Sequence, residues 1–517
     1  MKKSLLLALL LSLPSPAAQP DIGHRAAAVG TVELRRLPHA IVADDGDEPD
    51  APMPTPADLP VPAEAIRRGV TEPVTASDAV YAPAITMQSF PAIDDDNTAF
   101  PPDTNGAAGP SHLVTTLNTA LRIQDRGGAV LQTVSIRSFF DSVRNLGRVF
   151  DPHVTFDPRT NQWMICAITD QRTSSTAQRT GSALLLAISK TGNPLLTWDL
   201  YRFDGPEGVW LDFPELGYDE DSIVISVNVY NLADDKFVRA NVFVINRGNP
   251  AGAYVRLEHA TNGGGSLSPT ISMDAGGKKT YLLQTWNGNF QNSGFVRLYS
   301  VSSAGIVPIA FAQSTATWDS TSGSPDDFAP QLGRVEKIDS GDSRMHSAVL
   351  RNGNIWATHT AYIPSGAPTR TAVNWWRLTP AGVIVSRGTI DDPTSTFDYA
   401  HPSIAVNRNN DALIGCSRFS ATTLPSAVYA QVGAGAPLPV VFKAGESSYV
   451  KTGTGTKNRW GDYSAACVDP TNDLDFWTIQ EYASTPAPGY DRWGTWWARI
   501  AAPTLQSTPP RRRSVRH

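Results

Sequence analysis

One pattern of residues recurs along this chain and constrains its fold more than any other feature. Each copy has a small residue or Pro, alternating apolar positions, an Asp or Asn, a short turn rich in Gly, Asn or Asp, and a second apolar run. The pattern is that of a β-hairpin. The five clearest copies are DPHVTFDPRTNQW from Asp151, FPELGYDEDSIV from Phe213, SPTISMDAGGKKTY from Ser268, HPSIAVNRNNDAL from His401 and YSAACVDPTNDLDFW from Tyr463.

The spacing of these copies predicts a ring of sheets. Two weaker copies begin at Pro101 and Met345, and the seven units lie about 50 to 62 residues apart, with one gap of about 77. This is slightly above the period of four-stranded propeller blades, and longer loops would account for the excess. We therefore expect an all-β, seven-bladed β-propeller of four-stranded antiparallel blades over residues 80–502, with little helix.

The last unit predicts how the ring closes. It has three clear strands, SAACVD, DFWTIQEYA and WGTWWARI, and then the pattern ends. A ring held only by packing would leave an exposed strand edge at this point. We predict that an N-terminal strand within residues 80–90 supplies the fourth strand of this unit.

The two ends of the chain differ from the repeats. Residues 1–18 have a basic start, a short apolar run and a small-residue site, which is typical of a signal peptide. Residues 19–79 are rich in Pro, Ala and acid, which predicts a flexible lead-in, and residues 503–517 predict a disordered basic tail. We expect a secreted, periplasmic or extracellular protein without membrane insertion.

Charge and cysteine content exclude some partners and frameworks. The net charge is −6, and six positive charges lie in the signal peptide and the tail, so the rest carries about −12. This disfavours a nucleic-acid partner. Three cysteines cannot form a disulfide framework; a Cys416–Cys467 bridge is one interpretation and buried free thiols are the one we favour. We expect a monomer.

The register of the repeats brings polar residues together at one mouth of the predicted central channel. Residues just before the innermost strand of each blade should converge there, and convergent charged groups are what a ligand site needs. The predicted ligand-binding residues are Asp151, Asp212, Arg344, His346 and Arg459. The predicted catalytic residues are His401, Asp462, Tyr463 and Glu481.

Each of these residues also has a structural interpretation. Asp and Asn at strand starts commonly accept hydrogen bonds from backbone N–H groups. Arg459 and Asp462 could form an ion pair, His401 could be a packed side chain, and Glu481 could be a loop carboxylate bonded to backbone. A Glu beside a Tyr, as at Glu481 and Tyr482, can also activate the phenol in sugar chemistry.

An acidic loop at residues 93–106 suggests a calcium site. Hard oxygen ligands at short spacing suit Ca²⁺, although the EF-hand pattern is absent. The predicted ligands are Asp94, Asp96, Asp103 and Asn105, with a solvated acidic turn as the alternative. No other cofactor is predicted.

The segments PPDTNGAAGP, FDPHVTFDPRTNQW, WLDFPELGYDEDS and RWGDYSAACVDP resemble a family of uncharacterised secreted bacterial β-propeller proteins, over about residues 101–500. That resemblance implies the propeller fold and no inherited catalytic residues. More distantly, the architecture is similar to that of sialidase-like propellers. This similarity implies that Arg344, Arg459, Asp462, Tyr463 and Glu481 act on a sugar, although the sialidase repeat boxes are degenerate here and a third arginine is not identified.

Two functional hypotheses follow. In the first, the protein binds a carbohydrate or related extracellular ligand in its central funnel, with or without cleaving it as a hydrolase or lyase. Six tryptophans also favour sugars: Trp210, Trp286, Trp375, Trp376, Trp460 and Trp493. In the second, the propeller is a non-enzymatic surface or matrix protein that presents a rigid platform to another protein.

Overall fold

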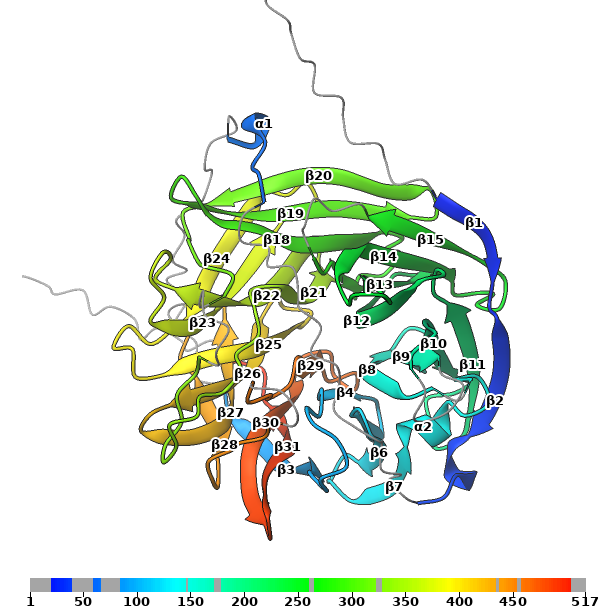
Figure 1. Cartoon of the computed structure of the whole chain (residues 1–517), viewed down its shortest axis with the longest axis horizontal. Helices are drawn as coiled ribbons and strands as arrows, with labels where there is room; N and C mark the ends of the chain where they lie inside the picture. Colours follow the sequence, from blue (N-terminus) through cyan, green and yellow to red (C-terminus); the bar gives the residue numbers. More distant parts are fainter. Residues whose placement is uncertain are drawn as a thin grey trace, which may run out of the picture.

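The computed structural model describes residues 20–39, 59–66, 84–145, 147–171, 178–259, 265–321, 328–433, 437–452 and 457–503. The described residues form a ring of β-sheets around a central axis (Figure 1). The strands nearest the axis in Figure 1 are β4 (Asn105–Ala108), β8 (Val149–Asp157), β12 (Val209–Tyr218), β21 (Met345–Arg351), β25 (Asp398–Val406) and β29 (Ala465–Val468). The expectation of an all-β propeller with small antiparallel blades is confirmed.

Hydrogen bonding groups the strands into six sheets, and four of these have four strands. The first contains β4, β5 (His112–Thr116), β6 (Ala120–Asp125) and β7 (Val130–Ser135). The second contains β16 (Ser268–Pro269), β18 (Thr280–Phe290), β19 (Ser293–Ser302) and β20 (Gly305–Ser314). The third contains β25, β26 (Ala412–Ser420), β27 (Thr423–Val432) and β28 (Val440–Lys443), and the fourth contains β29, β30 (Phe476–Ala487), β31 (Tyr490–Ile500) and β3 (Thr86–Asp94).

The other two sheets are larger. A five-stranded sheet contains β8, β9 (Gln162–Gln171), β10 (Gly181–Ser189), β11 (Thr197–Asp204) and β2 (Ala28–Glu33). A ten-stranded sheet joins β12, β13 (Ser222–Asn231), β14 (Phe237–Asn246), β15 (Ala253–His259) and β1 (Pro20–Arg25) to β21, β22 (Asn354–Ile363), β23 (Arg370–Leu378) and β24 (Ile384–Ile390). The two halves meet through the two-residue strand β17 (Ile271–Ser272), which pairs in parallel with both.

The sequence predicted seven separate blades, but the hydrogen bonding defines six sheets among the described residues. Among the described residues, five sheets have the size of a single blade, and the ten-stranded sheet is continuous through β17. The repeat spacing misses this because a parallel bridge of one or two residues leaves no trace in an alternating pattern. The seven separate sheets of the sequence prediction are therefore corrected to this arrangement.

The predicted ring closure is present. Strand β3 pairs antiparallel with β31, from Thr86 opposite Ile500 to Asp94 opposite Gly494. The strand therefore begins and ends somewhat later than the predicted segment 80–90, whose first residues lie outside the described ranges. Neighbouring sheets pack closely here. A Cβ added at Gly106 would lie only 2.7 Å from the Trp497 ring.

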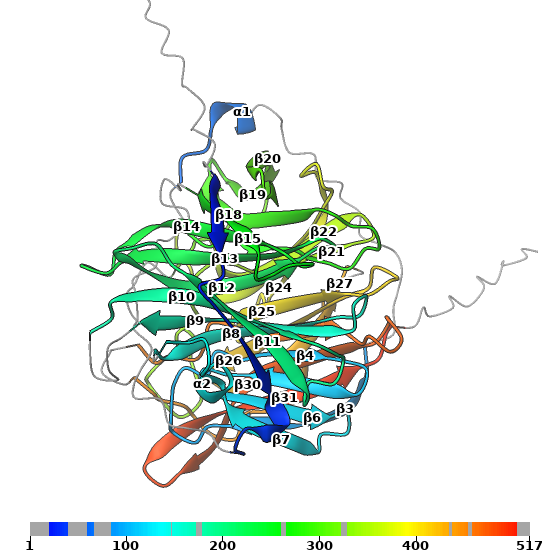
Figure 2. The ribbon, with the colours of Figure 1, turned by 90° about the vertical axis from the view of Figure 1, so that its right-hand side faces the viewer.

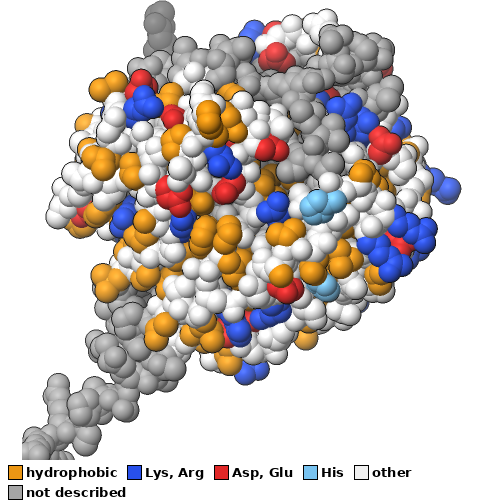
Figure 3. Space-filling model, turned by 90° about the horizontal axis from the view of Figure 1, so that it is seen from below, with side chains coloured by type: hydrophobic (Ala, Val, Ile, Leu, Met, Phe, Trp, Pro, Cys, Tyr) orange, Lys and Arg blue, Asp and Glu red, His pale blue; other side chains and the backbone are white. Residues whose placement is uncertain are grey.

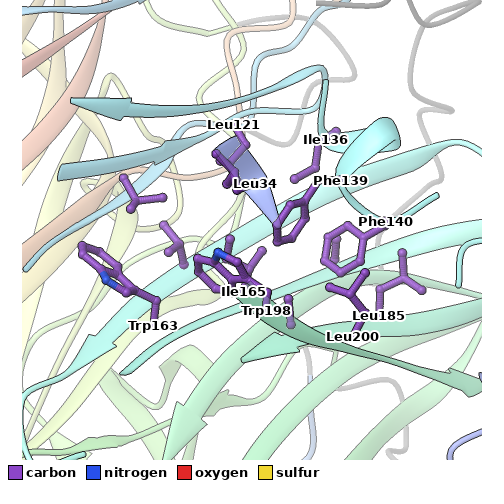
Figure 4. Close-up of a cluster of buried hydrophobic side chains, with 14 of the residues drawn as sticks. Leu34, Leu121, Ile136, Phe139, Phe140, Trp163, Ile165, Leu185, Trp198 and Leu200 are labelled. Carbon is purple, nitrogen blue, oxygen red and sulfur yellow. The ribbon is translucent and has the colours of Figure 1, made fainter. Parts of the chain in front are cut away.

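The predicted flexible lead-in is wrong for residues 20–39 and 59–66. Strand β2 pairs with β11 and β1 pairs with β15, so this N-terminal segment adds an outer strand to two sheets (Figure 2). Leu34 is fully buried among Phe139, Trp198 and Leu121 (Figure 4). The average composition of residues 19–79 conceals the short alternating run AVGTVELRRL that makes these contacts.

Helix is scarce, as expected. The helical elements among the described residues are η1 (Leu34–Arg36), α1 (Ala63–Ile66) and α2 (Ile136–Phe139). Within that part of the chain, no helix has the length and apolar character needed to cross a membrane. The three cysteines are free thiols, with Cys166 and Cys416 buried and Cys467 partly buried. The predicted signal peptide and basic tail lie outside the described residues.

Leu34→Ala tests whether the N-terminal segment is part of the folded core. Because the side chain is fully buried, its truncation should lower the free energy of unfolding by about 2–5 kcal/mol. Val29→Ala is the matched control, since Val29 on the adjoining strand is 58% exposed and should change stability little. Urea unfolding measures both; equal effects of the two substitutions would contradict a structural role for this segment.

Candidate functional site

Three inner strands share the same irregular backbone in their first half, near one mouth of the channel. Asp151, Phe213 and His401 each precede a proline and each has a left-handed φ of 50–55°. The ladder register shifts at these points in β8, β12 and β25. Such bulges redirect side chains, and the left-handed residues store strain on the order of 1–3 kcal/mol each. The bulges therefore position the side chains at this mouth.

The residues predicted at the mouth are linked by direct contacts or by electrostatic interactions. We call Asp151, Asp212, Arg344, His346, His401, Arg459, Asp462 and Tyr463 the mouth cluster. Its members lie on, or in the loops before, the inner strands β8, β12, β21, β25 and β29 (Figure 1). These residues therefore lie near one another, and their ligand-binding and catalytic roles stay predictions.

Asp151 holds the cluster together by hydrogen bonds. Its Oδ2 accepts hydrogen bonds from the Tyr463 hydroxyl and from the Phe213 backbone N–H, both at 3.1 Å. Its own N–H donates to the Asn118 side chain at 2.7 Å. The side chain is almost fully buried, so the structural interpretation of Asp151 is favoured over direct ligand binding.

Two carboxyl groups of the mouth cluster have pKa values that are shifted in opposite directions. Burial and the neighbouring Asp462 raise the pKa of Asp212. Burial alone would also raise the pKa of Asp462, but the guanidinium groups of Arg459 and Arg344 outweigh it and hold that pKa below its usual range. The site therefore contains a proton-donating carboxyl beside an ionised one.

The arginines are held in defined positions. Arg344 donates two hydrogen bonds to the Asp342 carboxylate, at 2.8 and 2.7 Å, and lies 4.1 Å from the centre of the Phe213 ring. Arg459 forms an ion pair with Asp462 at 3.4 Å, which is the structural alternative weighed for that pair. Asp342 was not predicted from the sequence, although its position two residues before Arg344 could have indicated an ion pair.

The histidines of the mouth cluster are neutral. His346 and His401 rings lie 6.3 Å apart, and burial lowers the pKa of His346 to about 3 and also lowers that of His401. Tyr463 packs edge-on against His153 at 4.4 Å, and burial raises its pKa well above 10. Tyr463 is therefore a neutral phenol at physiological pH.

Glu481 lies beneath the mouth cluster and is almost fully buried. A Cβ placed on Gly461 would be 3.0 Å from its Oε2 and 3.7 Å from Asp103 Oδ1, so the glycine of RWGDYS leaves room for both groups. Neither carboxyl oxygen has a hydrogen-bond partner among the described residues. Burial, together with Asp103 and Asp95, raises the pKa of Glu481 well above 4.5. Its catalytic role stays a prediction.

Sequence reasoning also missed Glu215. It lines a small cavity of about 80 Å³ in the channel, together with His153, His346 and Tyr463. Burial raises the pKa of Glu215 well above 4.5, against the influence of Arg344. The available signal was its place on the inner strand, two residues after Phe213 in FPELGY.

The residues predicted to bind calcium do not converge. Asp94 accepts from the Tyr482 hydroxyl at 3.4 Å, Asp96 from the Thr98 N–H at 3.1 Å, Asp103 from Asn118 at 2.7 Å and from the Asp462 N–H at 2.9 Å, and Asn105 from the Val154 N–H at 2.9 Å. Within the described ranges, no group of three or more His, Cys, Asp or Glu side chains is arranged to hold a metal ion. The loop therefore serves as hydrogen-bond acceptors for its neighbours.

Most of the tryptophans proposed to stack on sugar rings belong to the core. Trp210, Trp375, Trp376, Trp460 and Trp493 are buried, and Trp460 packs between Phe419 and Tyr449. Trp286 is partly exposed and donates a hydrogen bond to the Pro60 carbonyl at 3.1 Å. The aromatic argument for a sugar ligand is therefore weakened, and the carboxylate pair carries more weight.

Glu481→Gln tests the buried carboxyl. The folded protein retains a proton on Glu481 that the unfolded chain releases above about pH 4.5, so the wild type loses stability as pH rises above that value. The variant cannot ionise and should be more stable than the wild type at neutral pH and about equal to it near pH 4. Urea unfolding across this range measures the difference.

Glu446→Gln is the control of opposite sign. Partial burial raises the pKa of Glu446, but hydrogen bonds from Lys443 and Thr485 outweigh burial and lower that pKa below its usual value. The ionised Glu446 therefore stabilises the fold above pH 4.5, and this stabilisation is lost as pH falls through the folded-state pKa. That variant should be less stable than the wild type at neutral pH and equal to it in acid. A neutral-pH loss for Glu481→Gln would contradict the burial of an unpaired carboxyl.

Comparisons with known proteins show likeness in fold alone. No family model matches the chain, and no curated protein matches it. Solved structures similar to it include a glycosyl hydrolase from Bacteroides ovatus, with 12% identity, a TM-score of 0.30, and 57% of this chain and 87% of that chain covered. The GH93 α-L-arabinofuranosidase of Fusarium graminearum has 9% identity and a TM-score of 0.39, with 81% of this chain and 98% of that chain covered. The endosialidase of phage phi92 has 8% identity and a TM-score of 0.35, with 79% of this chain and 68% of that chain covered. Identities and TM-scores this low carry no argument about activity.

Proposed function

We propose that this protein is a secreted β-propeller that binds a carbohydrate or related extracellular ligand at the mouth cluster and cleaves it by acid–base chemistry. The observation that carries the proposal is the pair Asp212 and Asp462, whose pKa values are displaced in opposite directions. Cleavage of a glycosidic bond commonly uses two carboxyl groups, one protonated and one ionised.

Each residue of the pair has a role in this proposal. Asp212, the more buried carboxyl, donates the proton to the leaving group. Asp462 is more exposed, with about a quarter of its side chain accessible, and acts as the ionised base or nucleophile. Arg459 and Arg344 keep Asp462 ionised, so that it can act as the base or nucleophile at physiological pH.

The proposal has a structural component. We count the ten-stranded sheet as two blades, β12–β15 and β21–β24, which would make the ring seven-bladed. The reason is that β17 contributes two residues to the connection, whereas each half has a full antiparallel ladder. A crystal structure with an extended ladder through β17 would contradict this count.

Asp462→Asn tests the chemistry. The purified mature protein is offered a panel of polysaccharides, and binding and the release of reducing or unsaturated ends are read together, which separates a hydrolase from a lyase. Asp462→Asn should lower release by roughly 100-fold or more while the protein stays folded. Asp199→Asn is the matched control, because Asp199 pairs with Lys190 on an outer strand and should leave release unchanged.

Asp212→Asn gives a second readout. An acid with a raised pKa produces a fall in rate as pH rises through that pKa, so the wild type should lose activity on the alkaline side, and the variant should lack this limb. Release that persists in both variants would contradict the assigned roles. Binding without release in the wild type would leave a lectin-like module and contradict the cleavage step.

A protein-binding platform is the second candidate function. Two exposed apolar side chains favour it: Leu332 and Val335, on the loop that precedes Arg344. Leu332 is 43% exposed and Val335 is 91% exposed. Exposed apolar residues near a functional face mark protein contacts when they gather into a patch. Figure 3 shows one side of the ring, where charges of both signs are interspersed with hydrophobic side chains. The absence of both polysaccharide binding and release of reducing or unsaturated ends would favour this second function.

A further inference from the structure

A second cavity lies at the opposite end of the channel from the mouth cluster. The mouth cluster gathers where inner strands begin, whereas this cavity is lined where they end, at Ala108, Tyr218, Arg351, Val406 and Val468. Its volume is about 320 Å³. The two ends of one channel therefore offer separate sites.

The lining of this cavity is mainly apolar. The apolar part of the wall includes Ala107, Ile271, Met273, Val349, Ile404 and Val406. Water in a cavity needs two to four polar partners, and an apolar wall does not supply them. An apolar ligand would therefore displace poorly held water at little cost.

The charges at the rim compensate one another. Arg351 pairs with Asp473, and Asp157 accepts Arg159 at 3.1 Å and Arg247 at 2.6 Å. Asp157 is fully buried, and both of its arginines lie over the Tyr218 ring at 5.3–5.4 Å. Since these partners are already engaged, the rim does not favour a charged ligand.

The size of the cavity selects a small molecule over a protein segment. A helix about 10 Å across occupies on the order of 400 Å³ per turn, which is more than the whole cavity. An apolar cavity of about 150 Å³ accommodates benzene, so about 320 Å³ suits a molecule of two fused rings. The 80 Å³ cavity above it shares Thr155, Ser347, Ala466 and Cys467 with this one and is too small for such a ring system.

We propose that the cavity at the carboxyl ends of the inner strands is a second binding site, for an uncharged apolar molecule of bicyclic size. It is independent of the mouth cluster and of the chemistry proposed there. The apolar wall supplies affinity through burial, and the hydroxyl groups at its inner end set a polar limit to how far the molecule enters.

Titration with prodan, an uncharged naphthalene dye whose emission shifts to the blue in apolar surroundings, tests the site. The wild type should bind one dye molecule saturably with a blue shift. Ala466→Phe and Ser347→Leu, on two different strands, fill the cavity and should weaken binding by roughly tenfold or more. Near-ultraviolet circular dichroism checks that each variant is folded, and either folded variant is sufficient.

Two controls locate the dye. Val335→Asp removes an apolar side chain that is 91% exposed and should leave dye affinity unchanged, as should Asp462→Asn at the other end of the channel. The inference is overturned if the wild type shows no saturable binding, if a folded cavity-filling variant binds as the wild type does, or if either control weakens binding as much as the filling variants. Because dye binding needs no substrate, failure here is distinguishable from failure at the mouth cluster.

Discussion

The ladder between β3 and β31 is the interaction on which the rest of the structure depends, because it joins the two ends of the ring. It also brings the acidic loop after β3 beneath the mouth cluster. Asp95 donates its N–H to the Trp493 carbonyl at 3.0 Å and pairs with Lys451, while Asp103 accepts the Asp462 N–H at 2.9 Å. Ring closure therefore places Asp103, one of the residues predicted to bind calcium, where it accepts a hydrogen bond from the loop RWGDYS.

The mouth of the channel stores free energy that the rest of the ring must offset. Left-handed residues before prolines, a paired but buried Arg344, and carboxyl groups such as Glu215 and Glu481 that are deprived of water all destabilise the folded state. Interlocked sheets compensate, as at Trp497 over Gly106, and the buried Leu34 adds a contact outside the repeats. Strain and desolvation concentrated at one end of a rigid scaffold are typical of a functional site.

Much of this could be predicted from the sequence, and the limits have physical causes. The hairpin repeat predicted the propeller, the missing strand of the last unit predicted closure, and the register of the repeats predicted which residues meet at the mouth. Individual roles could not be read, because the partners are remote: Asp103 and Asp462 are 359 residues apart in sequence, and Tyr463 and Asp151 are 312 apart. The sequence did not reveal the contacts of Asp103 or of residues 20–39, because composition was averaged over segments whose single residues, such as Asp103 and Leu34, contact parts of the chain remote in sequence.

Strand direction explains why the two ends of the channel differ. All the inner strands run from the mouth toward the second cavity, so whatever the repeat places at a strand start gathers at one end and whatever it places at a strand end gathers at the other. The first halves of the strands carry Asp, His and Pro with bulges, whereas the ends carry apolar residues such as Ala108, Val406 and Val468 beside the paired charges of Asp157 and Arg351. Between them lies the cavity of about 80 Å³, which is too small for a molecule of bicyclic size. A ligand that fills the apolar cavity therefore cannot reach the carboxylate pair, and any influence of one end on the other must pass through the inner strands themselves.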